Sequence, residues 1–359
     1  MSGLLDHIRR RIAREGPISV ADYMALALGH PEHGYYMTRD PFGRAGDFVT
    51  APEISQMFGE LVGLWSAQVW DDIGRPKPFK WIELGPGRGT LAADALRAIK
   101  GIAGMADALN IHLVETSPLL REHQERAIAA WSPQWHGALA QVPDSPAVVV
   151  ANEFFDALPV RQYQRGEAGW HERLVTATET GELAFTLSPR LGIDPVLPPA
   201  FAHARPGAVV EVSPAATGVM RALADRLVRA GGAALVIDYG HATSAAGETL
   251  QAVKGHAYAD PFAEPGLVDL TAHVDFQALA DTARGTGAQV FGPVKQGDLL
   301  RRLGIEVRAG RLRANVDAAG RAAIDAALQR LTGTDAMGRL FKALAVTAPG
   351  QAAPAGFEG

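Results

Sequence analysis

The sequence contains no cysteine and no long apolar run, and these absences exclude several classes of protein. Without cysteine the 359-residue chain has no disulfide, no thiolate nucleophile and no cysteine-bound zinc. Its 11 histidines show no pairing at helical spacing of the kind that binds a metal ion. No apolar run approaches the length of a membrane-spanning helix. We therefore expect no metal site and no membrane span.

Basic residues are too few and too scattered for a protein that binds nucleic acid. Lysine and arginine total 34 against 39 acidic residues, which gives a net charge of −5, and no basic block could follow a phosphate backbone. The first residues lack the apolar core of a secretion signal, and Asp6 and Glu15 argue against a transit peptide. We predict a cytoplasmic protein with no nucleic acid partner.

The composition that remains is that of an ordinary globular protein. Hydrophobic residues make up 47% of the chain, charged residues 20% and aromatic residues 7%, with no disordered or fibrous bias. The length is enough for one elaborated α/β domain or two modest ones, and we favour one.

Residues 80 to 91, KWIELGPGRGTL, are the stretch around which the rest of the chain is organised. An apolar run breaks into alternating glycines, Gly85, Gly87 and Gly89, and then opens an alanine- and leucine-rich stretch. This pattern predicts a strand, a tight loop and a helix. A loop without Cβ atoms brings backbone N–H groups and a helix N-terminus close to a ligand at the end of the strand. The alternative is an ordinary strand-to-helix turn whose glycines serve packing.

The glycine spacing separates two classes of nucleotide-like cofactor. The dinucleotide fingerprint needs its third glycine at position 90, where this chain has Thr90, so NAD fits poorly. Glu83 stands two residues ahead of Gly85, and acid-x-Gly-x-Gly-x-Gly is similar to the first motif of Rossmann-like S-adenosylmethionine methyltransferases. The sulfonium and ammonium of that cofactor are attracted by an acid, whereas a pyrophosphate would be repelled.

A second acid, Glu115, ends the strand predicted over residues 111 to 115. A carboxylate at the tip of the second strand can accept hydrogen bonds from both ribose hydroxyls of an adenosine. The alternatives are a solvated charge at the strand end, or an N-cap for the helix that Ser117 and Pro118 start. We favour the role in ribose binding.

The stretch from Asn152 to Pro159 carries the residues that we expect to act on the methyl acceptor. It follows the apolar run at 147 to 151, which predicts a strand buried on both faces of a parallel sheet. Asn152, Glu153 and Asp156 would then project over the reactive end of the cofactor. Two carboxylates can hold a planar guanidinium by charge-assisted bonds, so an arginine is a suitable acceptor. The alternative for Asn152 and Asp156 is a cap of the local turn.

The flanking regions predict helices at both ends of the chain and an antiparallel insertion. A capping box at residues 19 to 22 opens a helix that ends at Gly29, and a second one at residues 50 to 53 opens a helix to about residue 73. Asp238 and Tyr239 end another buried strand and could reach the site, although a turn former and a rim residue are the alternatives. A lone histidine such as His273 is more often a cap than a base.

Five sequence blocks together resemble the MidA-like methyltransferases, the family of the mitochondrial complex I assembly factor. The blocks are residues 46–60, 83–91, 152–159, 238–240 and 271–276, and the match runs from about residue 16 to 346. The resemblance implies transfer of methyl groups from S-adenosyl-L-methionine to an arginine of the 49-kDa-type catalytic subunit of NADH dehydrogenase, giving symmetric dimethylarginine. It leaves open a non-catalytic assembly chaperone, and also a methyltransferase that acts on a small molecule.

We therefore predict an α/β fold, a Rossmann-like class I methyltransferase with a mostly parallel sheet, an N-terminal helical cap, an antiparallel β insertion and a C-terminal helical extension. The predicted boundaries are 1–78 for the cap, 79–348 for the methyltransferase domain, about 160–206 for the insertion, about 296–335 for the extension and 349–359 for a frayed tail. The oligomeric state stays open, with a homodimer as one alternative. The residues predicted to act on the acceptor are Asn152, Glu153 and Asp156. The residues predicted to bind the cofactor are Phe48, Thr50, Glu83, Gly85, Pro86, Gly87, Gly89, Glu115 and Thr116. We expect the segment at 46 to 54 to close over the site.

Overall fold

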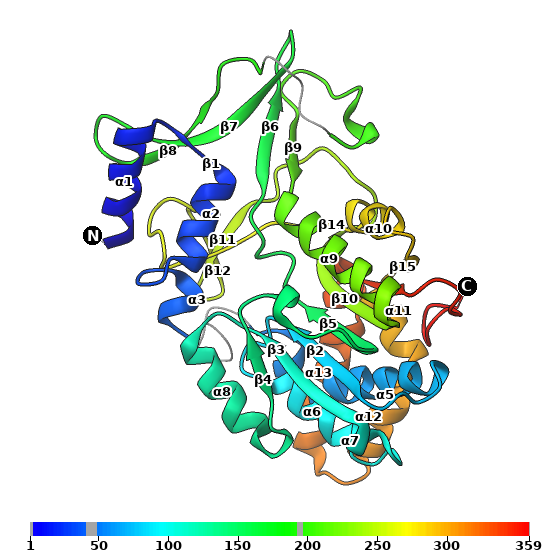
Figure 1. Ribbon diagram of the computed structural model, residues 1–359. Helices are drawn as coiled ribbons and strands as arrows, with labels where there is room; N and C mark the ends of the chain where they lie inside the picture. The colour runs from blue at the N-terminus through cyan, green and yellow to red at the C-terminus, as the bar shows by residue number, and fades with distance from the viewer. Residues whose placement is uncertain (1–2, 41–48, 192–196, 359) are drawn as a thin grey trace.

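A computed structural model describes residues 3–40, 49–191 and 197–358 of the chain. Two lobes are visible in Figure 1. We call the lobe built on the main sheet the large lobe, and the lobe built on residues 3–38, 161–212 and 251–271 the small lobe. The cavity described below lies between them.

The large lobe contains the mostly parallel sheet that the sequence predicts. Its strand order is β15-β16-β10-β5-β2-β3-β4, with the two-residue β14 beside β10. All pairs are parallel except those of β16, which runs antiparallel to both of its neighbours. The carboxyl ends of β2, β3 and β5 therefore meet at one edge of the sheet. The strands are β2 (Phe79–Leu84), β3 (Leu109–Val114), β4 (Gln134–His136), β5 (Ala147–Asn152), β10 (Gly232–His241), β14 (Val274–Asp275), β15 (Gln289–Lys295) and β16 (Phe341–Thr347).

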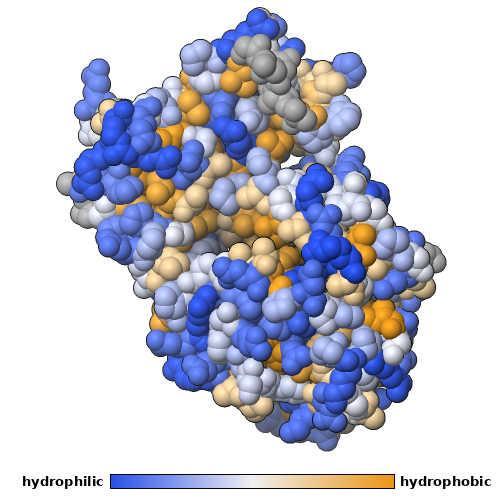
Figure 2. All heavy atoms as spheres, viewed as in Figure 1, coloured by the Kyte–Doolittle hydropathy of each residue, from blue (hydrophilic) through white to orange (hydrophobic). Residues whose placement is uncertain are grey.

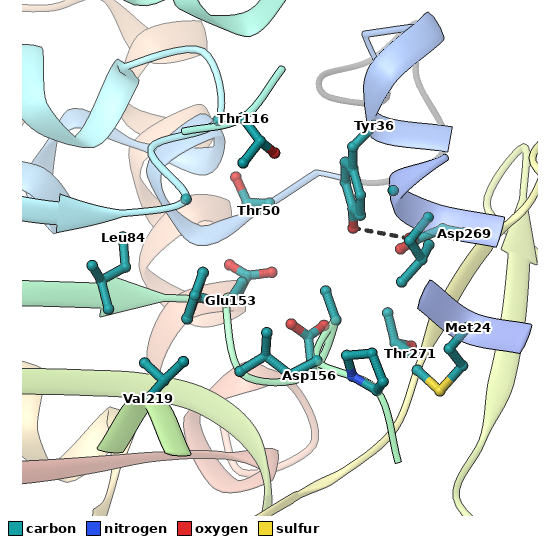
Figure 3. Close-up of a pocket in the computed structure, with 18 of the residues that line it drawn as sticks. Met24, Tyr36, Thr50, Leu84, Thr116, Glu153, Asp156, Val219, Asp269 and Thr271 are labelled. Atoms are coloured by element: carbon teal, nitrogen blue, oxygen red, sulfur yellow. Dashed lines mark hydrogen bonds between the residues drawn. The ribbon is translucent and has the colours of Figure 1, made fainter. Parts of the chain in front are cut away.

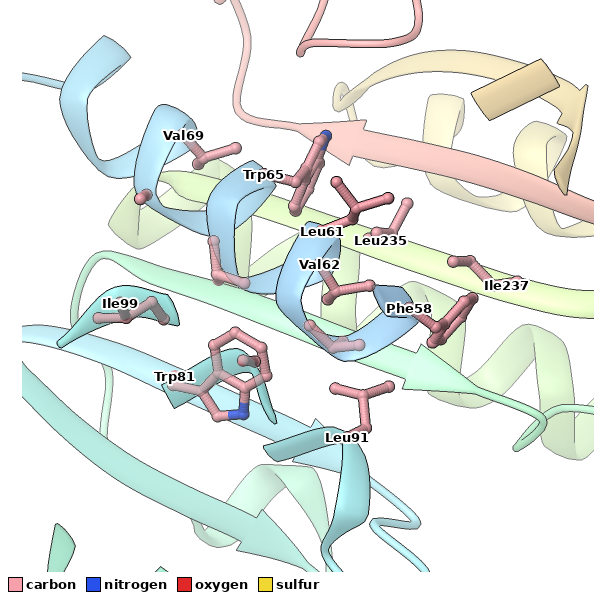
Figure 4. Close-up of a cluster of buried hydrophobic side chains, with 14 of the residues drawn as sticks. Phe58, Leu61, Val62, Trp65, Val69, Trp81, Leu91, Ile99, Leu235 and Ile237 are labelled. Atoms are coloured by element: carbon pink, nitrogen blue, oxygen red, sulfur yellow. The ribbon is translucent and has the colours of Figure 1, made fainter. Parts of the chain in front are cut away.

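Helices cover both faces of this sheet. On one face, α5 (Gln56–Asp72) and α6 (Thr90–Ile99) bury an apolar cluster that includes Trp65 and Trp81 (Figure 4). On the other face, α9 (Pro214–Ala230) and α10 (Phe276–Arg284) cover a second cluster. Besides the C-terminal extension, the other helical segments of this lobe are α4 (Ala51–Ile54), α7 (Met105–Ala108), α8 (Pro118–Ile128) and two 3-10 turns, Ala129–Trp131 and Leu139–Gln141.

The predicted capping box at Thr50 is wrong. The Thr50 side chain makes no cap hydrogen bond, and α5 begins at Gln56 with Ser55 as its N-cap. Glu53 instead accepts a hydrogen bond from the hydroxyl of Thr90 at the start of α6. Glu53 therefore binds a side chain of the neighbouring helix α6, and not the backbone N–H at the start of its own helix as the capping-box pattern predicts.

The small lobe contains the antiparallel insertion, and the N-terminal helices pack on it. The sheet order is β1-β7-β6-β9 with β8 beside β7, and a separate three-stranded sheet has the order β12-β11-β13. The N-terminal helices share one apolar core with both sheets. The elements are α1 (Gly3–Glu15), β1 (Ile18–Ser19), α2 (Val20–Gly29), α3 (Tyr35–Thr38), β6 (Arg161–Arg165), β7 (Trp170–Ala177), β8 (Leu183–Leu187), a 3-10 turn (Pro199–Phe201), β9 (Val209–Val212), β11 (Gln251–Lys254), β12 (Ala257–Ala259) and β13 (Asp269–Thr271).

The C-terminal extension is helical, as predicted. Its helices are α11 (Gln296–Arg302), α12 (Ile305–Arg313), α13 (Ala318–Thr332) and α14 (Met337–Leu340). The expectation of a frayed tail is wrong for its described part, because Phe357 is buried in the apolar cluster of the large lobe. Among the described residues, no helix is both long and apolar enough to cross a membrane.

Candidate active site

The glycine loop connects β2 to α6 at the carboxyl edge of the main sheet. Gly85, Gly87 and Gly89 have φ angles of +61°, +55° and +82°. Residues with a Cβ adopt this left-handed region only with steric strain. A Cβ on Gly85 would also lie 2.9 Å from the ring of Phe154. Gly89 is the N-cap of α6, and a Cβ on it would lie 3.2 Å from the backbone of Gln124 in α8.

Glu83 is buried beneath this loop and is 3% exposed. Its Oε2 has no hydrogen-bond partner among the described residues. Burial raises the pKa of Glu83 to about 8, because an isolated carboxylate is poorly solvated there. Glu83 lines a small cavity of about 40 Å³ together with Thr50, Pro86 and Asn152. An ammonium group in this cavity would satisfy the orphan oxygen and favour the ionised carboxylate.

Glu115 follows β3 directly, and its carboxylate binds the backbone ahead of α8, whose N-cap is Ser117. Oε1 accepts hydrogen bonds from the backbone N–H groups of Thr116 and Ser117, both at 2.8 Å, at the start of α8. Oε2 accepts from Nε2 of Gln124 at 3.1 Å. A carboxylate has about four acceptor positions, so it could still accept a ribose hydroxyl. Glu115 and Thr116 both line the large cavity.

Glu153 follows β5 in a backbone conformation that is rare for a residue with a side chain. Its φ is +50°, and such strain is concentrated at functional sites. Its Oε1 accepts hydrogen bonds from the Ala51 N–H at 2.9 Å and from Nδ2 of Asn152 at 3.2 Å. Burial raises the pKa of Glu153 to about 7. Asn152 therefore orients Glu153.

Asp156 completes the acid pair, and its position depends on Asp238. Oδ2 of Asp238 accepts hydrogen bonds from the backbone N–H groups of Phe154, Phe155 and Asp156, at 3.1, 2.9 and 3.2 Å. Asp238 is fully buried, so it anchors the turn. Oδ1 of Asp156 has no partner among the described residues, and burial raises the pKa of Asp156 to about 6.

A cavity of about 890 Å³ joins these groups to the small lobe. Figure 2 shows the molecule hollowed between the lobes, with hydrophobic residues gathered there. In Figure 3, Glu153 and Asp156 face side chains of the small lobe across the cavity. Several lining residues were not predicted from the sequence: Met24, Tyr36, Gly137, Ala138, Leu139, Asp269, Thr271 and Arg330.

Other predicted residues have mixed outcomes. Thr50 lines both cavities, and Phe48 lies outside the described residues. Tyr239 and His273, expected as a rim residue and a cap, both line the large cavity. The N-cap of α10 is Asp275, whose Oδ1 accepts from the Ala278 N–H at 3.0 Å.

Residues 61–294 match the model of a family of S-adenosyl-L-methionine-dependent methyltransferases. This chain belongs to that family. It is 38% identical to the Drosophila melanogaster "Protein arginine methyltransferase NDUFAF7 homolog, mitochondrial", over 96% of this chain and 84% of the relative. The human protein arginine methyltransferase NDUFAF7 is also 38% identical, over 85% of this chain and 74% of its own. A Burkholderia thailandensis crystal structure bound to S-adenosyl-homocysteine is 31% identical, with a TM-score of 0.82 over 99% of this chain and 92% of that chain.

The methyltransferase uses S-adenosyl-L-methionine, as the sequence predicts. The cytoplasmic location predicted above is contradicted, because the fly, zebrafish and human relatives are named as mitochondrial proteins. The prediction relied partly on Asp6, which in the structure lies in α1 at 3.5 Å from Arg9. The acids of this segment thus belong to a folded helix and carry no information on location.

Proposed function

We propose that this methyltransferase modifies an arginine side chain of a protein, and that the acceptor is the 49-kDa-type catalytic subunit of NADH dehydrogenase, left as symmetric dimethylarginine. The fly and human relatives match 96% and 85% of this chain and are named as protein arginine methyltransferases, which supports a protein arginine as acceptor. The subunit and the methylation state follow from the family resemblance given above.

The observation that carries the proposal is the pair of acids Glu153 and Asp156 in a cavity large enough for a side chain. A guanidinium has five N–H donors and no acceptor, so it complements two neighbouring carboxylates. The raised pKa values of both acids show that ionisation is costly in the cavity when no cation is present. A bound guanidinium would remove that cost.

The two acids would act mainly by holding the acceptor in place. The cofactor supplies an electrophilic methyl group. Glu153 and Asp156 would orient the guanidinium, so that one nitrogen faces that methyl group and stays rich in electrons. The proton that the nitrogen loses on methylation can pass to either carboxylate, because a carboxylate that holds the guanidinium lies within hydrogen-bond reach of that nitrogen.

The cofactor side of the site would be formed by the glycine loop and the two strand-end acids. We propose that Glu83 holds the ammonium group, with Thr50 and Pro86 around it, because Glu83 has an orphan oxygen and lines the small cavity. Glu115 would accept from the ribose hydroxyls beside Thr116. These assignments fit the donor-rich and cationic chemistry of S-adenosyl-L-methionine.

Mass spectrometry of the 49-kDa-type subunit, from cells with and without this protein, tests the proposal. We expect one arginine that is heavier by two methyl groups only when the protein is present, and fragment ions that distinguish symmetric from asymmetric dimethylarginine. An unmodified subunit whose assembly still depends on this protein would support the chaperone. Turnover of the cofactor with a small molecule and no protein acceptor would support the other alternative.

A further inference from the structure

Across the cavity from Glu153 and Asp156, the small lobe presents a hydrogen-bonded pair. The hydroxyl of Tyr36, in α3, donates to Oδ1 of Asp269, in β13, at 2.9 Å. Both side chains line the large cavity, and Asp269 is 4% exposed. Figure 3 shows the tyrosine ring reaching into the space between the lobes, with the bond to Asp269 on its far side.

This geometry makes Tyr36 a hydrogen-bond acceptor toward the cavity. A tyrosine hydroxyl has one proton and retains acceptor capacity when that proton is used. The proton of Tyr36 is used by Asp269, so a ligand in the cavity meets the oxygen lone pairs. Burial raises the pKa of Tyr36 well above its usual value, with the charge of Asp269 adding to the effect, so the hydroxyl stays neutral.

The cavity thus has acceptor oxygens on two opposite sides. Glu153 and Asp156 belong to the large lobe, and Tyr36 belongs to the small lobe. Between them, apolar side chains of the small lobe could contact the aliphatic stem of an arginine. These side chains are Met24, Leu28, Met37 and Val253. A guanidinium is planar and has N–H donors on every edge, so it can donate to both sides at once.

We propose that Tyr36 binds the acceptor guanidinium from the small lobe, and that Asp269 is the positioning residue that orients Tyr36. The inference rests on the proposed function, because it requires an arginine as the acceptor. The acceptor is then clamped between the lobes, with the carboxylates on one side and the phenol oxygen on the other. The N-terminal helices and the insertion therefore contribute directly to substrate recognition.

Tyr36→Phe tests the phenol oxygen. We expect KM for the purified 49-kDa-type subunit to rise about tenfold, the loss of one hydrogen bond to a charged group, while kcat changes less. Calorimetry should show the same loss in binding of the subunit to the protein loaded with S-adenosyl-homocysteine. Affinity for S-adenosyl-L-methionine should change less than affinity for the subunit, because the proposal places Tyr36 on the acceptor and not on the cofactor.

Tyr23→Phe is the matched control. Tyr23 is another buried tyrosine of the small lobe, and its hydroxyl donates to the carbonyl oxygen of Pro261. It does not line the large cavity. Removing its hydroxyl changes the small lobe in a similar way but leaves the acceptor-binding wall intact, so KM for the subunit should not change.

Asp269 is tested by a pair of variants. Asp269→Ala removes the group that fixes the Tyr36 hydroxyl and should raise KM as Tyr36→Phe does. Asp269→Asn keeps an oxygen that can accept from Tyr36 and should restore most of the affinity. Rescue by asparagine separates orientation of Tyr36 from a general need for negative charge.

The outcomes separate the inference from the function on which it rests. Wild-type protein that methylates the subunit, with an unchanged KM and subunit affinity in folded Tyr36→Phe, would overturn the inference and leave the function standing. Wild-type protein that methylates no arginine of the subunit would overturn both. If Tyr36→Phe does not fold, the comparison of Asp269→Asn with Asp269→Ala decides the question by the same two measurements.

Discussion

Among single residues, Glu153 combines an unusual backbone with an unusual charge environment. Its left-handed φ of +50° is unfavourable for a residue with a Cβ, and its carboxyl is buried beside Asp156. Both conditions cost free energy of folding. They are maintained by the Ala51 N–H on its side chain and by Asp238 on the turn that follows. A residue held in this way at a cavity wall is suited to a role in binding.

Glu153→Gln should separate methyl transfer from cofactor binding. Glutamine keeps the size and an oxygen that can accept from the Ala51 N–H, but it removes the charge that orients a guanidinium. We expect methyl transfer in a single turnover to fall at least roughly a hundredfold, the scale for losing one preorganised electrostatic contact in a dry site. Asp156→Asn should have a smaller effect. Near-normal transfer by Glu153→Gln would refute the clamp, and lost cofactor affinity would make Glu153 a cofactor ligand.

The pKa values of the acid pair predict the pH dependence of activity. Glu153 has a pKa raised to about 7 and Asp156 one raised to about 6, so below these values the carboxyls are protonated and hold a cation poorly. We expect kcat/KM for the subunit to rise as the pH passes through 6 to 7 and then to level off, because kcat/KM reports the free enzyme. Glu153→Gln should lose the upper part of this rise. A flat profile in wild-type protein would contradict the prediction.

Stability should change with pH in the opposite direction to activity. A carboxyl whose pKa is higher in the folded than in the unfolded state binds more protons when folded, over the pH range between the two values. For Glu153 this range runs from the ordinary glutamate pKa of 4.5 to about 7. Its contribution to the free energy of unfolding therefore falls as the pH rises through that range. Glu153→Gln should reduce this dependence in denaturant titrations.

At the scale of helices and strands, the sequence predicted what local patterns determine. The helix that opens at Ser19 and ends at Gly29 has the expected bounds, and the glycine loop lies between a strand and a helix as expected. Each depends on caps, glycines and apolar periodicity within a few residues. The parallel strands β2, β3 and β5 end on the same edge of the sheet. Glu115 and Glu153, which follow β3 and β5, therefore line one cavity.

The rest depends on contacts that no local pattern encodes. Tyr36 and Asp269 are separated by 233 positions in the sequence. The pairing of β1 with β7 joins the N-terminus to the insertion, and it converts an expected separate cap into part of the small lobe. Residues 251 to 259 form a hairpin, because Gly255 and His256 adopt φ angles of +57° and +64°. A single sequence contains no signal for these pairings.

Asp238 connects two elements, and its removal should disrupt the acid turn. It lies at the carboxyl end of β10 and accepts N–H bonds from three residues after β5. Asp238→Ala should lower the free energy of unfolding by at least about 2 kcal/mol, since each bond to a charged group is worth about 1.5 to 3 kcal/mol. Methyl transfer should fall as well, because the turn positions Asp156.

Asp281→Ala is the control for this prediction. Asp281 is exposed and pairs with Arg284 on the surface of α10, so its loss should change stability by no more than about 0.5 kcal/mol. Denaturant unfolding of both variants measures the difference. Equal stability of Asp238→Ala and Asp281→Ala would show that the turn is held by other contacts.

The whole molecule should respond to its cofactor as one folded unit. The large cavity receives residues from α2, α3, β13, α13 and the carboxyl edge of the main sheet, so a ligand there contacts segments from most of the chain. A ligand that binds only the folded state stabilises it by about 2.7 kcal/mol at a hundredfold excess over its Kd. Because residues of both lobes line the cavity, this stabilisation should include the small lobe.

S-adenosyl-homocysteine should therefore raise the Tm of the wild-type protein, whereas NADH should not, because the glycine spacing does not suit a pyrophosphate. Gly87→Val should abolish the shift, since its side chain would occupy the space where the loop meets the cofactor, and its left-handed φ should also cost about 1 to 2 kcal/mol.

Gly287→Val is the matched control: Gly287 has a φ of +91° and open space around it, and it lies outside both cavities. It should lose similar stability and keep the shift. A Gly87→Val protein that S-adenosyl-homocysteine still stabilises would remove the loop from the cofactor site, and a larger shift with NADH in wild-type protein would overturn the assignment of the loop to S-adenosyl-L-methionine.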